Sequence, residues 1–131
     1  MIGLDTNVLV RYIMQDDPQQ ARKANGLIDS LTLQEPGFVP IVAVIELVWV
    51  LTKPYELSRE QVAQAIDMLL RTKEIILDRA EQIAQALRLY KTSTADFADC
   101  LIERLAASAG CVRTMTFDTK AAKLIGMTLI T

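Results

Sequence analysis

Short apolar runs alternate with longer helical patterns along the chain. Five runs have the length and composition of strands, namely residues 2–4, 38–39, 75–77, 112–116 and 127–130. The segments between them repeat apolar residues at helical spacing, as in residues 18–33 and in the series Ile83, Leu87 and Tyr90. Strands separated by helices join in parallel through right-handed crossovers. The pattern therefore predicts an α/β fold with a central parallel sheet flanked by helices.

Several helix ends are marked in the sequence. Ser58 and Gln61 have the spacing of a capping box, which predicts a helix beginning there. Gly110 and Gly126 stand where helices should stop and where a residue with positive φ is favoured. The Asn25-Gly26 pair weakens the helical pattern of residues 18–33.

Length and composition favour a single domain of residues 1–131. The chain has no internal repeat and no linker rich in Pro, Gly or Ser. Its most apolar stretch, residues 41–51, contains Glu46 and is far shorter than the ~20 residues of a membrane span. Nothing resembles a signal peptide, and two cysteines make no disulfide framework. We therefore expect a soluble, cytoplasmic protein.

The absence of histidine limits the possible chemistry. It excludes Ser-His-Asp and Cys-His nucleophiles, and it excludes zinc bound by imidazole. Two cysteines are too few for a four-thiolate zinc site. The net charge of −2 decides nothing about nucleic acid, because a basic rim can coexist with an acidic centre. The remaining chemistry must use carboxylates.

Acidic residues follow the predicted strands. Asp5, Asp118 and the pair Asp96 and Asp99 each stand at or near the start of a predicted helix. Any one of them alone fits an ordinary N-cap or first-turn acid. Asp96 and Asp99 are three residues apart and so share one helix face.

Glu46 has a different setting. It lies within a helix expected to begin near Pro40 and to be apolar on nearly every face, which predicts that the helix is buried. A buried carboxylate needs a cationic partner or a metal ion. An ion pair with an Arg or Lys from elsewhere is the structural alternative.

Taken together, the acids favour a metal site. The carboxyl ends of parallel strands are where function gathers in such sheets, and several carboxylates there repel one another without a cation. Ligands that are all oxygen suit Mg²⁺ or Mn²⁺, which commonly bridge to phosphates. Hydrolysis of phosphodiester bonds is the chemistry that this combination favours.

At these residues the sequence resembles the PIN-domain ribonucleases and, among them, the VapC-type toxins of toxin-antitoxin pairs. The resemblance spans essentially the whole chain. It is carried by residues 3–9 (Gly-Leu-Asp-Thr-Asn-Val-Leu), by Glu46, by residues 95–102 and by residues 116–118 (Thr-Phe-Asp). It implies a three-layer PIN-like fold.

The resemblance also implies a function and a site. It assigns Asp5, Glu46, Asp99 and Asp118 to an acidic centre, with Asp5, Asp99 and Asp118 as metal ligands and Asp96 as an additional catalytic acid. Either Asp96 or Asp99 fits the place of the direct ligand. Supporting roles fall to Thr6, Asn7 and Thr116. The implied activity is a Mg²⁺-dependent endoribonuclease, with Mn²⁺ as a substitute, that acts on cellular RNA, is neutralised by a cognate antitoxin and forms a homodimer.

Two further hypotheses concern surface residues. A cationic rim that faces RNA phosphates would include Arg11, Lys53, Arg113, Lys120 and Lys123, although ordinary solvated surface charge is the favoured explanation for them. The aromatic residues Tyr12, Trp49 and Tyr55 would line a groove for an antitoxin helix or a dimer contact. For Trp49 we favour core packing, because large aromatic side chains dominate cores.

Other function classes fit less well. A haloacid-dehalogenase-like phosphatase needs a second Asp at the position of Asn7, and a receiver-like domain needs an acidic pair where Asp5 stands alone. No glycine-rich loop for a dinucleotide follows a predicted strand. The remaining alternative is a non-catalytic PIN-like interaction module with a degenerate acidic site.

Overall fold

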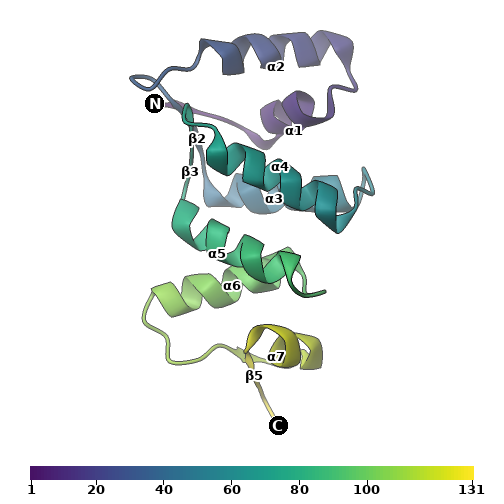
Figure 1. The fold of residues 1–131 in the computed structure, drawn as a ribbon, viewed down its shortest axis with the longest axis vertical. Helices are drawn as coiled ribbons and strands as arrows, with labels where there is room; N and C mark the ends of the chain where they lie inside the picture. The colour runs from purple at the N-terminus through teal and green to yellow at the C-terminus, as the bar shows by residue number, and fades with distance from the viewer. The chain divides into compact units, whose positions relative to one another are not determined.

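The computed structural model describes all 131 residues and divides into two compact units, residues 1–78 (unit 1) and 79–131 (unit 2) (Figure 1). Unit 1 contains β1 (Ile2–Gly3), α1 (Thr6–Met14), α2 (Pro18–Ser30), β2 (Gly37–Val39), α3 (Ile41–Thr52), α4 (Arg59–Arg71) and β3 (Ile75–Leu77). Unit 2 contains α5 (Ala80–Lys91), α6 (Phe97–Ser108), β4 (Met115–Thr116), α7 (Thr119–Ile125) and β5 (Thr128–Leu129). The prediction of one domain over residues 1–131 stays a prediction.

The predicted α/β architecture is confirmed, and all five predicted strands are present, several of them shorter than predicted. In unit 1 the strands form a parallel sheet in the order β1-β2-β3, with Ile2 opposite Gly37 and Gly37 opposite Ile75. In unit 2, β4 and β5 pair in parallel with each other, so the strands make two sheets. No helix is long and apolar enough to cross a membrane.

Gly37 packs closely against two leucine side chains in unit 1. A Cβ atom at this position would lie 2.7 Å from Leu4 Cδ1 and 2.9 Å from Leu31 Cδ1. Both leucines are buried, and the Leu4 N–H donates to the Phe38 carbonyl oxygen at 2.8 Å. The absence of a side chain at Gly37 therefore lets β1 and the residue after α2 close over β2.

The predicted helix signals are largely confirmed. Both hydrogen bonds of the capping box between Ser58 and Gln61 are present at the start of α4. Gly110 and Gly126 follow α6 and α7 with φ of 95° and 79°. Helix α2 runs through the Asn25-Gly26 pair and ends at Ser30 rather than at residue 33.

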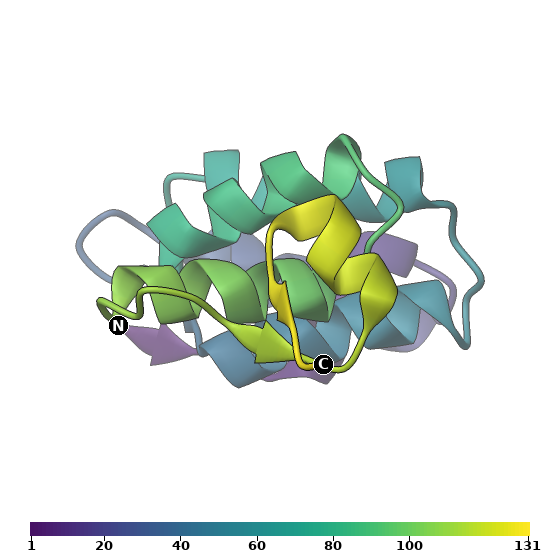
Figure 2. The same cartoon turned by 90° about the horizontal axis from the view of Figure 1, so that it is seen from below.

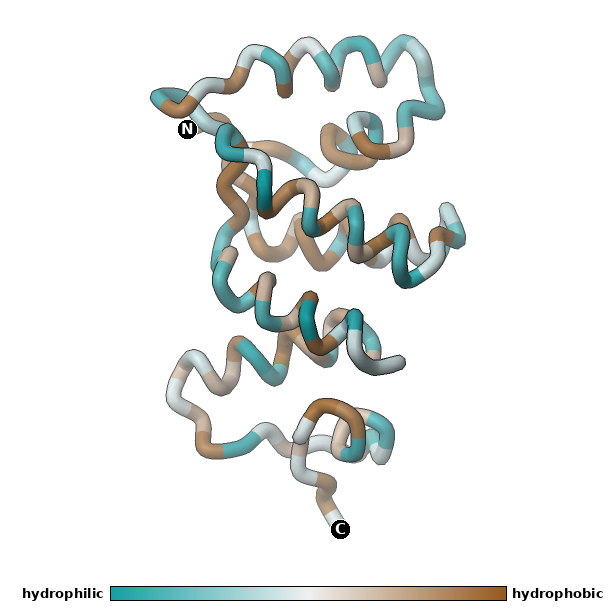
Figure 3. The backbone as a smooth tube through the Cα atoms, viewed as in Figure 1, coloured by the Kyte–Doolittle hydropathy of each residue, from teal (hydrophilic) through white to brown (hydrophobic).

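The prediction that α3 is buried on all sides was wrong. In Figure 3 this helix is largely brown, as its composition requires. One face is nevertheless exposed, with exposed fractions of 71% for Val42, 38% for Ile45 and 59% for Trp49. The opposite face is buried through Val44, Leu47 and Leu51 among others. The preference for Trp49 as a core residue was therefore wrong.

Unit 2 is built on the packing of α5 against α6 (Figure 1). Tyr90 and Phe97 meet edge to face between these helices, with ring centroids 5.7 Å apart. Figure 2 shows β4 and β5 side by side, and α7 packs against both strands. Backbone N–H groups of Thr128 and Ile130 donate to carbonyl oxygens of Thr114 and Thr116, each at 2.8 Å.

Candidate active site

Three of the predicted acids line one pocket in unit 2. Asp96 and Asp99, at the start of α6, lie with Asp118, just before α7, around a pocket of about 140 Å³. Lys120 and the small residues Ala95 and Ala121 complete the lining. The fold therefore brings Asp118 to the same pocket as Asp99 and Asp96, which lie 19 and 22 positions before it in the sequence.

Asp118 is held by the backbone around it. Its Oδ1 accepts hydrogen bonds from the N–H groups of Lys120 at 2.8 Å and Ala121 at 3.2 Å, so it is the N-cap of α7. Its own N–H donates to the Thr116 hydroxyl at 3.0 Å. Both capping bonds use Oδ1, which leaves Oδ2 available. Thr116 thus helps to position Asp118, and its supporting role in a functional site stays a prediction.

Asp96 occupies the N-cap position of α6, but its side chain makes no capping hydrogen bond. The backbone there satisfies one amide itself, because the Cys100 N–H donates to the Asp96 carbonyl oxygen at 3.1 Å. An N-cap acid usually accepts a bond from a free helix amide. The Asp96 carboxylate is therefore available for another ligand.

The charges of the three acids act on one another. Partial burial, followed by the negative charges of Asp96 and Asp118, raises the pKa of Asp99 above its ordinary value of 3.8. Each of these effects disfavours the ionised carboxylate. A cation in the pocket would reverse the charge effect, so the electrostatics fit a positively charged ligand.

In unit 1, Asp5 directly follows the buried Leu4 and caps α1. Its Oδ1 accepts a hydrogen bond from the Thr6 N–H at 2.8 Å, while the carboxylate itself is exposed. Thr6 is buried in the first turn of α1, and Asn7 is exposed next to it. Asp5 therefore has the local setting that the sequence predicts, with Oδ2 available.

The position of Glu46 contradicts the prediction that its carboxylate is buried. The carboxylate lies in the second turn of α3, as expected, but on the exposed face of that helix. It makes no ion pair, and water satisfies a charge at such a position. The argument that burial forces Glu46 to find a partner therefore fails, and only the resemblance supports its place in the site.

The donor set of the pocket fits a hard divalent cation. Within neither unit do three Asp, Glu or Cys side chains stand close enough together to hold a metal ion between them. Mg²⁺ does not need such a cage, since it keeps several waters and is commonly held by one or two carboxylates plus substrate phosphates. That Asp5 and Glu46 of unit 1 act with the three acids of unit 2 stays a prediction.

The predicted cationic rim has different surroundings at each position. Lys120 lines the acidic pocket, whereas Lys53, Arg113 and Lys123 are exposed. The Arg11 guanidinium is already engaged, because it donates to Asp16 at 3.2 Å, to Gln20 at 2.7 Å and to the Tyr55 hydroxyl at 3.3 Å. Arg11 therefore serves mainly to join α1 to α2 and to the loops that carry Asp16 and Tyr55.

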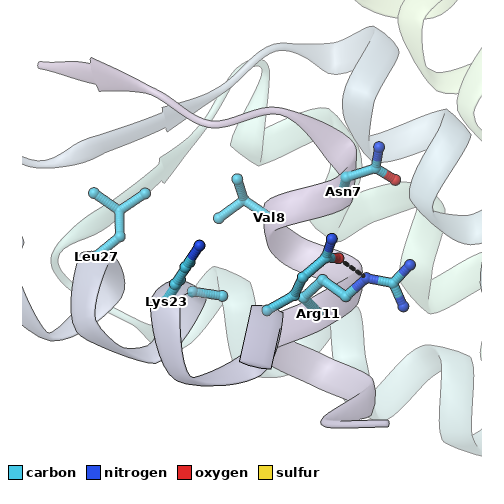
Figure 4. A pocket seen from close by; sticks show the side chains of 7 residues that line it. Asn7, Val8, Arg11, Lys23 and Leu27 are labelled. Carbon is cyan, nitrogen blue, oxygen red and sulfur yellow. Dashed lines mark hydrogen bonds between the residues drawn. The ribbon is translucent and has the colours of Figure 1, made fainter. Parts of the chain in front are cut away.

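A second pocket in unit 1 lies between α1 and α2 and has a volume of about 240 Å³ (Figure 4). Its apolar part comes from Val8, Ala24 and Leu27, and Lys23 and Asn7 add polar groups. The dashed line in Figure 4 marks the hydrogen bond that holds Arg11 beside Gln20. Asn7 thus lines this pocket from the first turn of α1.

Asp78 was missed at the sequence level. It directly follows β3, and its Oδ2 accepts a hydrogen bond from the Ile41 N–H at 3.4 Å. This contact provides a side-chain acceptor for the start of α3, where Pro40 at the N-cap provides none. The signal was present, because Asp78 follows its strand just as Asp5 and Asp118 follow theirs.

Comparison with known proteins identifies relatives of the whole chain. The PIN domain family matches residues 2–126 and so spans both units. A curated relative, the VapC ribonuclease of Aquifex aeolicus (strain VF5), is 26% identical over 122 residues, which cover 92% of this chain and 90% of the relative. The range that the family matches, residues 2–126, contains the positions of all five predicted acids.

Proposed function

We propose, since the chain belongs to the PIN domain family, that it is a Mg²⁺-dependent endoribonuclease that cleaves cellular RNA. The observation that carries the proposal is the pocket lined by Asp96, Asp99 and Asp118, in which partial burial, followed by the charges of the two neighbouring acids, raises the pKa of Asp99. The relative named as a ribonuclease supports RNA as the substrate. Mn²⁺ is expected to substitute for Mg²⁺.

The proposed metal ligands are Asp5, Asp99 and Asp118. The N-cap hydrogen bonds fix Asp5 and Asp118 through Oδ1 and leave Oδ2 free to coordinate a cation. Asp99 lies in the first turn of α6, where its half-buried side chain has little freedom. Thr6, Asn7 and Thr116 have supporting roles, of which the Thr116 hydrogen bond to Asp118 is the clearest.

Asp96 and Glu46 are the proposed acids beside the metal ligands. The Asp96 carboxylate makes no capping bond and is exposed, so it is able to orient a water molecule or accept its proton. Glu46 is exposed on α3 and has no ion-pair partner, which suits the same task. When bound, a divalent cation supplies a water of lowered pKa and neutralises charge on the phosphate.

We further propose that the protein is the toxin of a toxin-antitoxin pair, that it acts in the cytoplasm and that it forms a homodimer. The VapC name of the relative supports the antitoxin partner. The exposed apolar side chains Val42, Ile45 and Trp49 on α3 support a protein partner, because contiguous apolar surface commonly marks an interface. Tyr12 and Tyr55 are both half-buried and offer less surface than Trp49.

The test is cleavage of labelled total RNA by the purified protein and by the variants Asp5→Asn, Asp99→Asn and Asp29→Asn. Asp29 is an exposed acid near the end of α2, outside the proposed site, and so serves as the matched control. We expect the wild type and Asp29→Asn to cleave with Mg²⁺ or Mn²⁺ and to stop with chelator. Asp5→Asn and Asp99→Asn should be inactive.

Metal binding provides a second readout that does not depend on the RNA target. A cation that binds only the folded state increases the free energy of unfolding, by about 2.7 kcal/mol at a concentration 100 times its Kd, and so raises the melting temperature. We expect Mg²⁺ to stabilise the wild type and to have a much smaller effect on Asp99→Asn. Cleavage that survives both site substitutions would overturn the proposed site. No cleavage and no metal effect would favour the non-catalytic interaction module.

A further inference from the structure

A third pocket, in unit 2, is lined by cationic and neutral residues and lies between α5 and α6. Gln85, Arg88 and Leu89 are at helical spacing and share one stripe of α5, Thr92 is the C-cap of that helix, and Arg104 comes from α6. The pocket has a volume of about 300 Å³. Two guanidinium groups therefore line a single hollow whose lining contains no carboxylate.

Arg104 is held in place by its neighbour. Its Nε donates to Glu103 Oε1 at 2.6 Å, and its Nη2 lies 2.5 Å from the same oxygen. The Glu103 side chain is only 14% exposed, so it has little freedom. These contacts use one side of the guanidinium. The N–H groups of Nη1 have no protein acceptor and remain available to a ligand.

Arg88 has no partner in the protein. A cation in the last turn of a helix often hydrogen-bonds to the last carbonyl groups. Here hydroxyl groups already do this, because Thr92 Oγ1 donates to the Arg88 carbonyl at 3.0 Å and Ser93 Oγ donates to the Leu89 carbonyl at 2.7 Å. The Arg88 guanidinium and the Gln85 amide are both without a hydrogen-bond or ion-pair partner.

We propose that this pocket binds a phosphate group through Arg88 and Arg104, with Gln85 as an additional donor. Guanidinium groups bind phosphate oxygens through paired N–H donors, and two such groups line this one pocket. Glu103 offsets part of the charge of Arg104, and the carboxyl end of α5 disfavours an anion nearby. Both arginines are therefore needed to make the pocket attractive to an anion.

The ligand that fits the proposed function is an RNA phosphodiester, and this part of the inference rests on that function. The chain has a net charge of −2, and its acidic pocket repels phosphates unless a cation fills it. An RNA-binding protein with such a centre needs a local cationic site elsewhere. The pocket between α5 and α6 provides one within the same unit as three of the proposed site acids.

The test compares Arg88→Gln with Lys91→Gln. Both substitutions remove one positive charge from the last turn of α5, but Lys91 does not line the pocket. Binding of a labelled single-stranded RNA is measured by fluorescence anisotropy at several salt concentrations, in the Asp99→Asn protein so that cleavage cannot interfere. The logarithm of the binding constant falls linearly with the logarithm of the salt concentration, and each phosphate contact contributes ~0.7 to this salt slope. Loss of one contact should therefore reduce the slope by ~0.7 and weaken binding about 5-fold at 0.1 M salt.

We expect this reduction for Arg88→Gln and no change for Lys91→Gln. Equal effects of the two substitutions, or no effect of either, would overturn the proposal. The Arg side-chain N–H signals in NMR spectra identify the source of the phosphate. Shifts of the Arg88 and Arg104 signals on adding RNA alone indicate a phosphodiester, shifts with inorganic phosphate indicate a free phosphate, and the absence of shifts with both refutes the pocket.

The nuclease proposal and the phosphate-pocket proposal can be refuted separately. Wild-type protein that does not cleave RNA, combined with a salt slope that depends on Arg88, would remove the nuclease and keep the phosphate pocket. Cleavage that requires Asp99 but a slope unchanged by Arg88→Gln would keep the nuclease and remove the pocket.

Discussion

Replacement of Gly37 with alanine tests the packing that positions Asp5. Ordinary contacts of a Cβ atom lie between 3.4 and 4 Å, whereas Leu4 Cδ1 and Leu31 Cδ1 would be at 2.7 and 2.9 Å. The two methyl groups would have to move by about 0.7 and 0.5 Å to reach even the lower limit of 3.4 Å. Both leucines are buried, so neither can swing into solvent.

Overpacking of this kind costs about 1–3 kcal/mol, and the lower entropy of the unfolded alanine chain offsets ~0.4–1 kcal/mol of it. We expect Gly37→Ala to reduce the free energy of unfolding by about 1–2 kcal/mol in urea denaturation followed by circular dichroism. Since Leu4 directly precedes Asp5, cleavage activity should fall as well.

Two further variants make this prediction specific. Gly26→Ala lies within α2, and its Cβ would meet nothing within 4 Å, so the same substitution should stabilise the protein by about 0.5–1 kcal/mol. Leu31→Val removes one of the two Cδ1 atoms that an alanine Cβ at position 37 would crowd, so the double variant should be more stable than the sum of the single effects by at least ~0.5 kcal/mol. A Gly37→Ala protein as stable as the wild type, or strict additivity with Leu31→Val, would refute the reasoning.

Three other substitutions have defined outcomes. Ser58→Ala removes both the acceptor for the Gln61 N–H and the capping box, and it should cost about 1 kcal/mol in urea denaturation. Tyr55→Phe removes the hydrogen bond that lowers the pKa of Asp16, so that pKa should rise toward 3.8 in an NMR titration. Without metal at neutral pH, Asp99→Asn should melt at a higher temperature than the wild type, because the ionised Asp99 is disfavoured in the folded state.

The stability difference between the wild type and Asp99→Asn should depend on pH, and the direction of the pKa shift gives its sign. The pKa of Asp99 is raised on folding, so its ionisation destabilises the folded protein at neutral pH; this penalty begins to shrink as the pH falls through the folded-state pKa and is gone below the ordinary value of 3.8. The difference between the wild type and Asp99→Asn should therefore shrink from neutral pH toward acid pH. A stability difference that grows on acidification would contradict the raised pKa of Asp99. An unchanged pKa of Asp16 in Tyr55→Phe would contradict the role of the Tyr55 hydrogen bond. An unchanged stability of Ser58→Ala would contradict the role of the capping box.

Local signals in the sequence predicted the elements well. The strand at residues 75–77 and the capping box of Ser58 appear as predicted, because each depends on a few adjacent residues. The pattern could not predict which strands share a sheet. That choice depends on pairing between distant residues, and β4 pairs only with β5.

The site was predictable to the extent that it follows from chain order. Asp5 and Asp118 cap the helices that follow them, as the sequence indicates. The exposure of Glu46 was not predictable from its apolar neighbours, because Val42, Ile45 and Trp49 form an exposed apolar face of α3. The pocket of Arg88 and Arg104 was invisible in the sequence, since it exists only once α5 and α6 are packed.

The pairing of β4 with β5 has a consequence for where the protein can be shortened. The match to the PIN domain ends at residue 126, and β5 (Thr128–Leu129) lies beyond it. Two backbone hydrogen bonds from this strand hold the segment that carries Thr116 and leads into Asp118. A polypeptide cut at the family boundary would keep every acidic residue but lose the strand whose hydrogen bonds hold the segment before Asp118, so a truncation should leave residues 127–130 in place.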